Sequence, residues 1–311
     1  MSRQRQIVRQ GGFTVGICAT GASPDVSRLV VSIIAEAALM PLPLRKLVVV
    51  ASACPERILS DLRKIQGRDG RVDLVLEDAG RGKADAVNKI LARADGDLVA
   101  LVNSDATPES GAIAKLLAVA ASDPSVGAVS AMPVTEPKEG LTALLVDFMW
   151  SAHNECSLAL NHMNLSNHSS DELVVFRSSA IAMLPRNLVN DGAFLATTAR
   201  RKGYAVRFCP SAKVHIETPG RVSDIIRQRR RILFGHAQVW RRVGHPPKTV
   251  ESLLLFSTPI GLKLVVNAIS RHPKFLVVLP VALLSEVSAA LLAIQDAIRS
   301  SKRHTIWTRF T

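Results

Sequence analysis

A helix followed by a short apolar strand, between residues 80 and 107, constrains the fold of this chain more than any other segment. The segment reads GRGKADAVNKILARADGDLVALVNSDAT. Apolar residues recur at helical spacing over residues 84–94, which predicts a helix with one apolar stripe. Residues 98–102 form an unbroken apolar run of the length of a buried strand. Helix and strand in this order are typical of a sheet covered by helices.

The same alternation extends through the first two-thirds of the chain. We expect strands at residues 13–19, 47–50, 72–76, 98–102, 173–176 and 204–208, and helices at 26–39, 56–65, 84–94, 191–202 and 223–240. A further helix is expected to begin at Thr107, with Thr107 as its cap and Pro108 in its first position. The pattern predicts an α/β fold with a mostly parallel sheet.

The composition favours anionic partners. The 311 residues include 39 Lys and Arg against 26 Asp and Glu, a net charge of +13. Such a charge suits phosphates, nucleic acids or the cytoplasmic face of a membrane. Only 4% of the residues are aromatic, which argues against base stacking on single strands, and we expect no nucleic-acid partner. Four dispersed cysteines without a CxxC pair predict free thiols and no zinc site.

Two apolar runs near the C-terminus, residues 252–270 and 275–294, predict membrane association. Lys263 and Glu286 are the charged residues that interrupt them. Each run approaches the length of a spanning helix, and basic residues flank both, as at a cytoplasmic face. The runs would lie across, within or on the membrane. Two buried helices of a soluble protein are the alternative interpretation.

We therefore expect two domains, with a boundary near Pro246 and Pro247. The first, residues 1–245, would hold the sheet, and the second, residues 246–311, would hold the apolar helices. The basic N-terminus lacks the apolar core of a secretory signal. The sheet domain is accordingly expected on the cytoplasmic side of a membrane.

Charged residues within the segment from residue 80 to 107 indicate a phosphate and a metal. Lys83 begins the helix, where its charge opposes the helix dipole and calls for a nearby anion, and Arg81 adds a second cation. Asp105 follows the strand at the edge where open α/β sheets bind ligands. Asp105 could hold Mg²⁺ or Mn²⁺, with Asn103 as a carbonyl ligand. The alternatives are an exposed basic loop and a helix-capping aspartate.

Three later segments add residues that could take part in catalysis or ligand binding. Asp191 begins a predicted helix, either as its cap or as a general base. Gln228 and Arg231 share one face of the basic helix and can reach one site together. His215 lies in a predicted strand, either as a metal ligand or as an ordinary strand histidine.

Trp150 and His153 lie one turn apart in a probable helix. The tryptophan ring could stack on a sugar, or the helix could bury one amphipathic face. The residues leave both interpretations open.

Taken in order, these motifs resemble those of family 2 glycosyltransferases with the GT-A fold. GRGKADAVNKIL resembles the family's Gly-Lys…Ala…Asn segment beside the donor diphosphate, and LVNSDA resembles its strand-terminal DxD. NDGAFLATTARRKGYAVRF resembles the ED helix, and QRRRI resembles the Gln-x-x-Arg-Trp signature. The resemblance covers residues 13–243 and is strongest to archaeal-type, membrane-associated members.

The resemblance implies a Rossmann-like mixed sheet and an inverting, metal-dependent transfer. A sugar would move from a nucleoside-diphosphate sugar to the hydroxyl of a glycan or lipid-linked acceptor, with Asp191 as the catalytic base. The implied donor-binding residues are Arg81, Lys83, Asn88, Ser104, Gln228 and Arg231. The implied metal ligands are Asp105, Asn103 and His215, and the implied acceptor residues are Trp150 and His153.

Two other functions fit parts of the sequence. A nucleotidyltransferase of similar fold is one, although the glycine-containing loop at residues 19–24 lacks the lysine that such enzymes usually carry. The other is a non-catalytic, membrane-associated binding protein that uses the arginine-rich helix.

Overall fold

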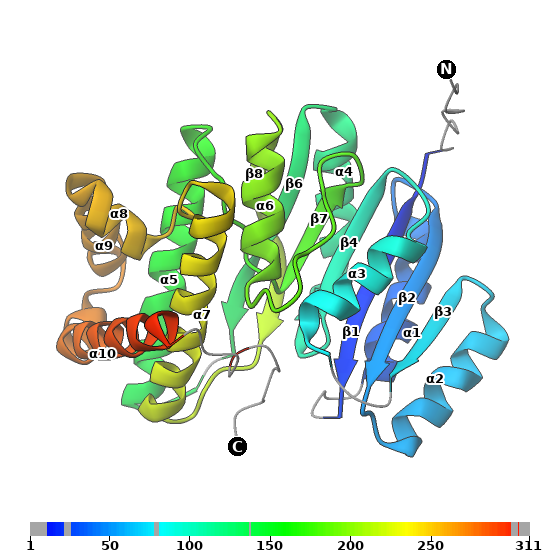
Figure 1. Ribbon diagram of the computed structural model, residues 1–311, viewed down its shortest axis with the longest axis horizontal. Helices are drawn as coiled ribbons and strands as arrows, with labels where there is room; N and C mark the ends of the chain where they lie inside the picture. The colour runs from blue at the N-terminus through cyan, green and yellow to red at the C-terminus, as the bar shows by residue number, and fades with distance from the viewer. Residues whose placement is uncertain (1–10, 22–25, 78–80, 137, 300–303, 305–311) are drawn as a thin grey trace.

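The computed structural model describes residues 11–21, 26–77, 81–136, 138–299 and 304. Gly80, the basic N-terminal ten residues and nearly all of the chain after 299 lie outside the described residues. The central element is an eight-stranded mixed sheet, in the order β3-β2-β1-β4-β7-β6-β8-β5 (Figure 1). The Rossmann-like mixed sheet predicted from the sequence is confirmed.

The strands of this sheet are β1 (Phe13–Thr20), β2 (Leu44–Ser52), β3 (Val72–Glu77), β4 (Leu98–Asn103), β5 (Ala106–Pro108), β6 (Val126–Thr135), β7 (Leu173–Arg177) and β8 (Ala205–Ile216). The helices are α1 (Val26–Glu36), α2 (Glu56–Arg68), α3 (Lys83–Arg93), α4 (Ala112–Ser122), α5 (Leu141–His162), α6 (Asp191–Arg201), α7 (Val222–Val243), α8 (Val250–Phe256), α9 (Thr258–Arg271) and α10 (Leu279–Ile298). Two short 3-10 helices, η1 (Ala37–Leu39) and η2 (Pro273–Val277), complete the list.

Strand direction changes in the middle of the sheet. The strands β1 to β4 pair in parallel, whereas β7 pairs antiparallel with both β4 and β6. Consequently the start of β7 lies beside the end of β4. Two apolar layers cover the sheet, with α1, α2 and α4 on one face and α3 and α6 on the other.

The predicted helix start at Thr107 is wrong. Thr107 and Pro108 belong to the short strand β5, in which Thr107 pairs with His215 of β8. The backbone N–H of Glu109 also donates to the carbonyl of Lys213 at 3.0 Å. The helix α4 begins only after Gly111, whose φ of 73° suits a residue without a Cβ. Strand pairing across a long sequence separation therefore outweighs the local Thr-Pro signal.

The C-terminal apolar runs form helices, but the first run is not continuous. It divides into α8 and α9 at Ser257, ahead of Pro259. In the described chain one helix, α10, is long and apolar enough to cross a membrane by length and composition. The helices α8 to α10 share apolar clusters with α5 and α7. The domain boundary at residue 245 stays a prediction.

Gly16, in the middle of β1, allows α3 to pack closely on the sheet. A Cβ at this position would lie 2.3 Å from Cγ2 of Ile90 and 3.0 Å from Cδ2 of Leu101. We expect Gly16→Ala to lower the free energy of unfolding by about 1–3 kcal/mol, because the added methyl overpacks this layer. Urea unfolding of the purified protein measures the change.

Gly67→Ala is the matched control, because a Cβ at Gly67 meets no atom within 4 Å. The Gly16 change should also be smaller in an Ile90→Ala background, which makes room for the methyl. Equal effects in both backgrounds would contradict this account of the packing.

Candidate active site

The N-termini of α3 and α6 and the segment before β7 bring a lysine and two carboxylates together. Nζ of Lys83 lies 3.1 Å from Oδ1 of Asp191 and 3.5 Å from Oδ2 of Asp171. These side chains line a pocket whose wall also includes Cys18 of β1 and Asn103 at the end of β4. A lysine at a helix start was expected to need a nearby anion. In this structure Asp171 and Asp191 supply the negative charge.

Asp191 is free to face the pocket because its neighbour caps the helix. The side chain of Asn190 accepts a hydrogen bond from the N–H of Ala193 at 3.2 Å, so the interpretation of Asp191 as a simple cap is wrong. Gly192 permits the close approach of Asp171, since a Cβ there would lie 1.9 Å from Oδ1 of Asp171. The local sequence Asn-Asp-Gly thus has a separate role for each residue.

Burial and neighbouring charges together raise the pKa values of both Asp191 and Lys83. Burial and the charge of Asp171 together raise the pKa of Asp191 to about 7, although Lys83 opposes both effects. Burial also opposes the charged form of Lys83, but the two aspartates prevail and raise its pKa above the ordinary lysine value. Lys83 therefore stays cationic, while Asp191 can exchange a proton near neutral pH.

A second pair of acids lies at the end of β4. Nδ2 of Asn103 donates to Oε2 of Glu172 at 2.8 Å, and the backbone N–H of Asn103 donates to the carbonyl of Glu172 at 3.0 Å. Burial raises the pKa of Glu172 to about 7, and the charge of Asp105 is the next largest cause in the same direction. Two carboxylates, of Asp105 and Glu172, thus influence each other at the strand end where a metal was expected.

The sequence interpretation missed Asp171 and Glu172. The available signal was a pair of adjacent acids directly before the predicted strand at 173–176. Their relevance depends on β7 running antiparallel to β4, which places the beginning of one strand beside the end of the other.

The ring of His215 contacts two carboxylates, and neither of them is Asp105. Its ring atoms Nε2 and Nδ1 lie 3.1 Å from Oε1 of Glu109 and 2.9 Å from Oε1 of Glu136. Within the part of the chain that the structure describes, no group of three or more His, Cys, Asp or Glu side chains is placed to hold a metal. The role of His215 as a metal ligand stays a prediction.

Arg231 faces the acids from α7. Its charge interacts with Asp191, Asp171, Asp105 and Glu172, while burial lowers its pKa. Among the described residues, its buried Nε atom has no hydrogen-bond partner. Gln228 is half-buried one turn earlier on the same face. A buried donor without an acceptor beside a pocket is available for an anionic ligand.

The remaining predicted donor-binding residues lie in different surroundings. Arg81 is exposed, and Ser104 is buried directly after β4. The amide of Asn88 exchanges two hydrogen bonds with the backbone of Leu184, at 2.9 and 2.7 Å. Asn88 thereby ties α3 to the segment that leads into α6, and its contact with a donor stays a prediction.

Trp150 and His153 lie on α5 in a separate aromatic cluster. The ring centroids of Trp150 and His153 are 5.3 Å apart, and those of His153 and His168 are 5.8 Å apart. His236 of α7 follows at 5.2 Å from His168. Burial lowers the pKa of the first two histidines to about 3 and that of His236 to about 4. The cluster is therefore neutral at ordinary pH.

The depressed pKa of His168 has a consequence for stability. From about pH 6.5 downwards the unfolded chain binds a proton at this histidine that the folded chain does not, so stability falls as pH falls. We expect wild type to lose about 1–2 kcal/mol more than His168→Gln between pH 7 and pH 5. Urea unfolding at several pH values measures both proteins.

The charged neighbours of this cluster, Glu251 and Arg229, remain in both proteins. The exposed His162 provides the matched control, and His162→Gln should follow the wild-type pH dependence. Parallel curves for wild type and His168→Gln would contradict the buried, neutral state of His168.

The order of the strands is that of a GT-A fold, the fold of nucleotide-diphospho-sugar transferases. The acids at the carboxyl end of β4 lie where such a fold binds its ligand. Residues 10–235 match the family described as "Glycosyltransferase like family 2". The chain belongs to this family and is a glycosyltransferase, as the motifs predicted. A search of curated protein sequences returns no match.

Two solved structures share the fold. A mannosyltransferase from Pyrobaculum calidifontis, in complex with GDP-Man and Mn²⁺, superposes with a TM-score of 0.58 at 24% identity, over 94% of this chain and 81% of that chain. A glucosyl-3-phosphoglycerate synthase from Mycobacterium tuberculosis, in complex with Mn²⁺, UDP and phosphoglyceric acid, superposes with a TM-score of 0.50 at 16% identity, over 75% and 78% of the two chains. At these identities the likeness shows the fold.

Proposed function

We propose that this glycosyltransferase is inverting and metal-dependent, and that it moves a sugar from a nucleoside-diphosphate sugar to an acceptor hydroxyl. The observation that carries the proposal is that Lys83 and Asp191 line one pocket, and that the charge of Arg231 interacts with Asp191 and with Asp105 at the same strand edge. A base, two cations and a carboxylate at one site are the groups that such a transfer requires.

Asp191 is the proposed base. Its pKa of about 7 lets it take the proton of the attacking acceptor hydroxyl near neutral pH. Lys83 and Arg231 lie within the electrostatic reach of this carboxylate and would hold the negative charge of the donor diphosphate and of the leaving group. Arg81, Ser104, Asn88 and Gln228 remain the proposed outer donor-binding groups.

The residues present fit a divalent cation. Asp105 and Glu172 offer two carboxylates, and the amide of Asn103 uses its N–H on Glu172, so that its oxygen remains as a neutral third donor. Mg²⁺ and Mn²⁺ commonly bind one or two carboxylates together with substrate phosphates. When bound, the cation would offset charge on the leaving diphosphate. His215 joins this set once Glu109 and Glu136 release it.

The acceptor is proposed to be a glycan or a lipid-linked molecule near a membrane. Apolar side chains exposed on α8, α9 and α10 support a membrane location, with the sheet domain on its cytoplasmic side. Trp150 and His153 form the proposed acceptor wall on α5. A nucleotidyltransferase reaction would instead release pyrophosphate, so an assay that separates pyrophosphate from nucleoside diphosphate decides between the two reactions.

Two substitutions separate the roles within the site. Asp191→Asn should reduce sugar transfer by about 100-fold or more, because the proton acceptor is lost. Binding of nucleotide and Mn²⁺ should be preserved, because Lys83 keeps Asp171 as its acidic partner. Asp105→Ala should lose transfer together with metal-dependent nucleotide binding. Calorimetric titration and a transfer assay with labelled nucleotide sugars measure the two properties.

Asp61→Asn, on α2 where the aspartate side chain is 49% exposed, is the charge-matched control and should behave as wild type. Retained turnover in both site variants, with the fold intact, would refute the mechanism.

Glu172→Gln tests the second carboxylate without reference to activity. We expect the affinity for Mn²⁺ to fall by about tenfold or more, because the site loses one negative charge. Electron paramagnetic resonance of free Mn²⁺ measures this affinity. Glu139→Gln, on an exposed residue, is the control. Unchanged Mn²⁺ binding in Glu172→Gln, with binding lost in Asp105→Ala, would remove Glu172 from the metal set.

A further inference from the structure

The C-terminal helices separate their charges between two faces. Between residues 250 and 299 the acidic residues are Glu251, Glu286 and Asp296, and each contacts an arginine of α7. Arg229 binds Glu251 and also Glu286, with its Nε 2.5 Å from Oε1 of Glu286. The negative charges of this region are therefore directed inward.

The arginine that holds Asp296 is Arg230, the neighbour of Arg229 in α7. Its Nε and Nη2 atoms each lie 2.6 Å from an oxygen of Asp296. The Asp296 side chain is only 7% exposed. A fork-to-fork pair of this geometry fixes the C-terminal half of α10 against α7.

The outer face of the same helices is apolar and basic. On α10, Leu283, Leu284, Val287, Leu291 and Ile294 recur at helical spacing and are each at least 49% exposed. The basic residues Lys263, Lys274 and Arg299 are exposed on the same elements or at their ends. Arg271 is exposed as well, and it pairs with Glu155 of α5. An apolar face mixed with cations and without anions complements an anionic lipid surface.

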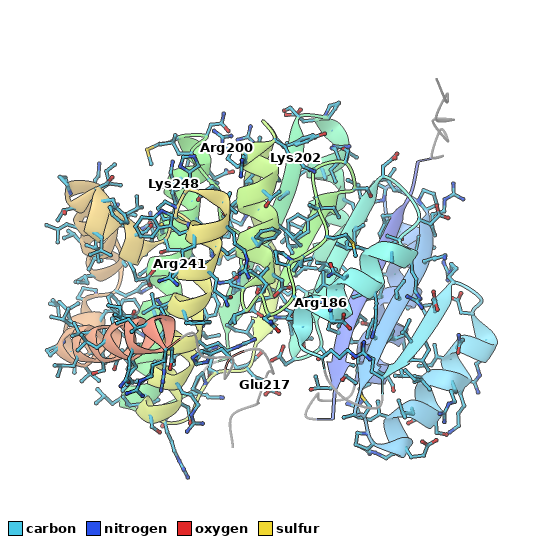
Figure 2. The ribbon with its side chains drawn as sticks, in the orientation of Figure 1. Arg186, Arg200, Lys202, Glu217, Arg241 and Lys248 are labelled. Carbon is cyan, nitrogen blue, oxygen red and sulfur yellow. The ribbon has the colours of Figure 1, made fainter. Side chains whose placement is uncertain are left out.

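A second exposed feature is an aromatic pair between α7 and α8. The rings of Trp240 and Phe256 lie 5.5 Å apart in an edge-on arrangement, and they are 45% and 59% exposed. Arg241 and Arg242 follow the tryptophan, and Figure 2 shows Arg241 on α7 and Lys248 near the start of α8. Tryptophan with adjacent arginines is typical of the headgroup region of a bilayer.

The ion pairs exclude a spanning role for α10 in this structure. Its 20 residues have the length to cross a bilayer. Crossing would require Glu286 and Asp296 to leave their arginines and enter hydrocarbon, which is strongly unfavourable. It would also take Asp296 from Arg230 and leave Glu251 as the acidic partner of Arg229. The helix is therefore held parallel to the surface of the protein.

From this partition of charge we infer that α8, α9, η2 and α10 dock the protein in the plane of an anionic bilayer surface, and that α10 does not span it. The surface is the outer face of these helices, at the end of the molecule opposite β3 (Figure 1). The inference deepens the proposed function, because a membrane-proximal acceptor rests on that proposal. It predicts that both ends of α10 lie on the same side of the membrane.

Vesicle sedimentation tests the docking. Wild type should bind vesicles of phosphatidylcholine with phosphatidylglycerol more tightly than vesicles of phosphatidylcholine alone. Leu284→Glu with Leu291→Glu should weaken this binding at least about tenfold. Leu39→Glu with Leu76→Glu adds the same charge at exposed leucines outside these helices and should bind as wild type. Equal binding by both double variants would overturn the inference.

A single charge reversal gives a milder second test. Lys263→Glu should weaken binding about fivefold or more on anionic vesicles and leave binding to neutral vesicles unchanged. Circular dichroism and hydrolysis of the nucleotide sugar confirm that each variant is folded. A wild-type dimer that the leucine variants dissociate, with no vesicle binding, would assign the face to a second copy and overturn the lipid inference.

The topology is tested with Lys274→Cys and Arg299→Cys in one chain, at exposed positions that flank α10. An impermeant maleimide is added to sealed vesicles before detergent, and labels above the wild-type background are counted by mass spectrometry. In-plane docking predicts either two labels on one molecule or none. One label per molecule would show a spanning helix and overturn the inference.

The two proposals fail in different experiments. Wild type that hydrolyses nucleotide sugar but binds no vesicle would refute the docking alone. Vesicle binding together with full activity in Asp191→Asn would refute the catalytic proposal alone.

Discussion

The ion pairs of Lys83 with Asp171 and Asp191 are the interaction on which the rest of the site depends. Burial and the charge of Asp171 raise the pKa of Asp191, and Lys83, 3.1 Å away, favours its charged form. The lysine needs the acids for the same reason. Lys83 begins α3, Asp191 begins α6 and Asp171 precedes β7. The two ion pairs therefore fix α3, α6 and the start of β7 relative to one another. A ligand that competes for Lys83 would therefore change the protonation of the proposed base.

The helix α7 repeats this principle on its other side. The charge of Arg231 interacts with four acids at and beside the pocket, while Arg229 and Arg230 hold the acids of α8 and α10. Three consecutive arginines thus point to two different acidic groups, because successive residues of a helix are about 100° apart. One helix therefore connects the proposed catalytic pocket with the proposed membrane face, and each face of that helix needs its own negative partners.

Local patterns in the sequence predict most of the helices and strands, but they do not predict which residues of different elements lie side by side. The strands and helices up to β4 follow from periodicity, whereas β6 (Val126–Thr135) is absent from the strands expected. Short motifs are enough to select Lys83, Asp105, Asp191 and Arg231. The short strand at Thr107 was missed because its pairing with β8 joins residues more than a hundred positions apart. Asp171 and Glu172 were missed because their place beside β4 depends on strand direction, which no local pattern encodes.

Asn103 shows why position matters more than residue type at this strand end. It stands where the family motif carries an acid, and its amide donates to Glu172 at 2.8 Å. A carboxylate at that position would repel Glu172, whereas the amide holds it in place. Because β7 runs antiparallel to β4, Glu172 directly before β7 supplies a negative charge beside Asn103, where the motif has no acid. A metal responds to the charge and distance of the oxygens around it, so a site of this kind can keep its chemistry while its motif changes.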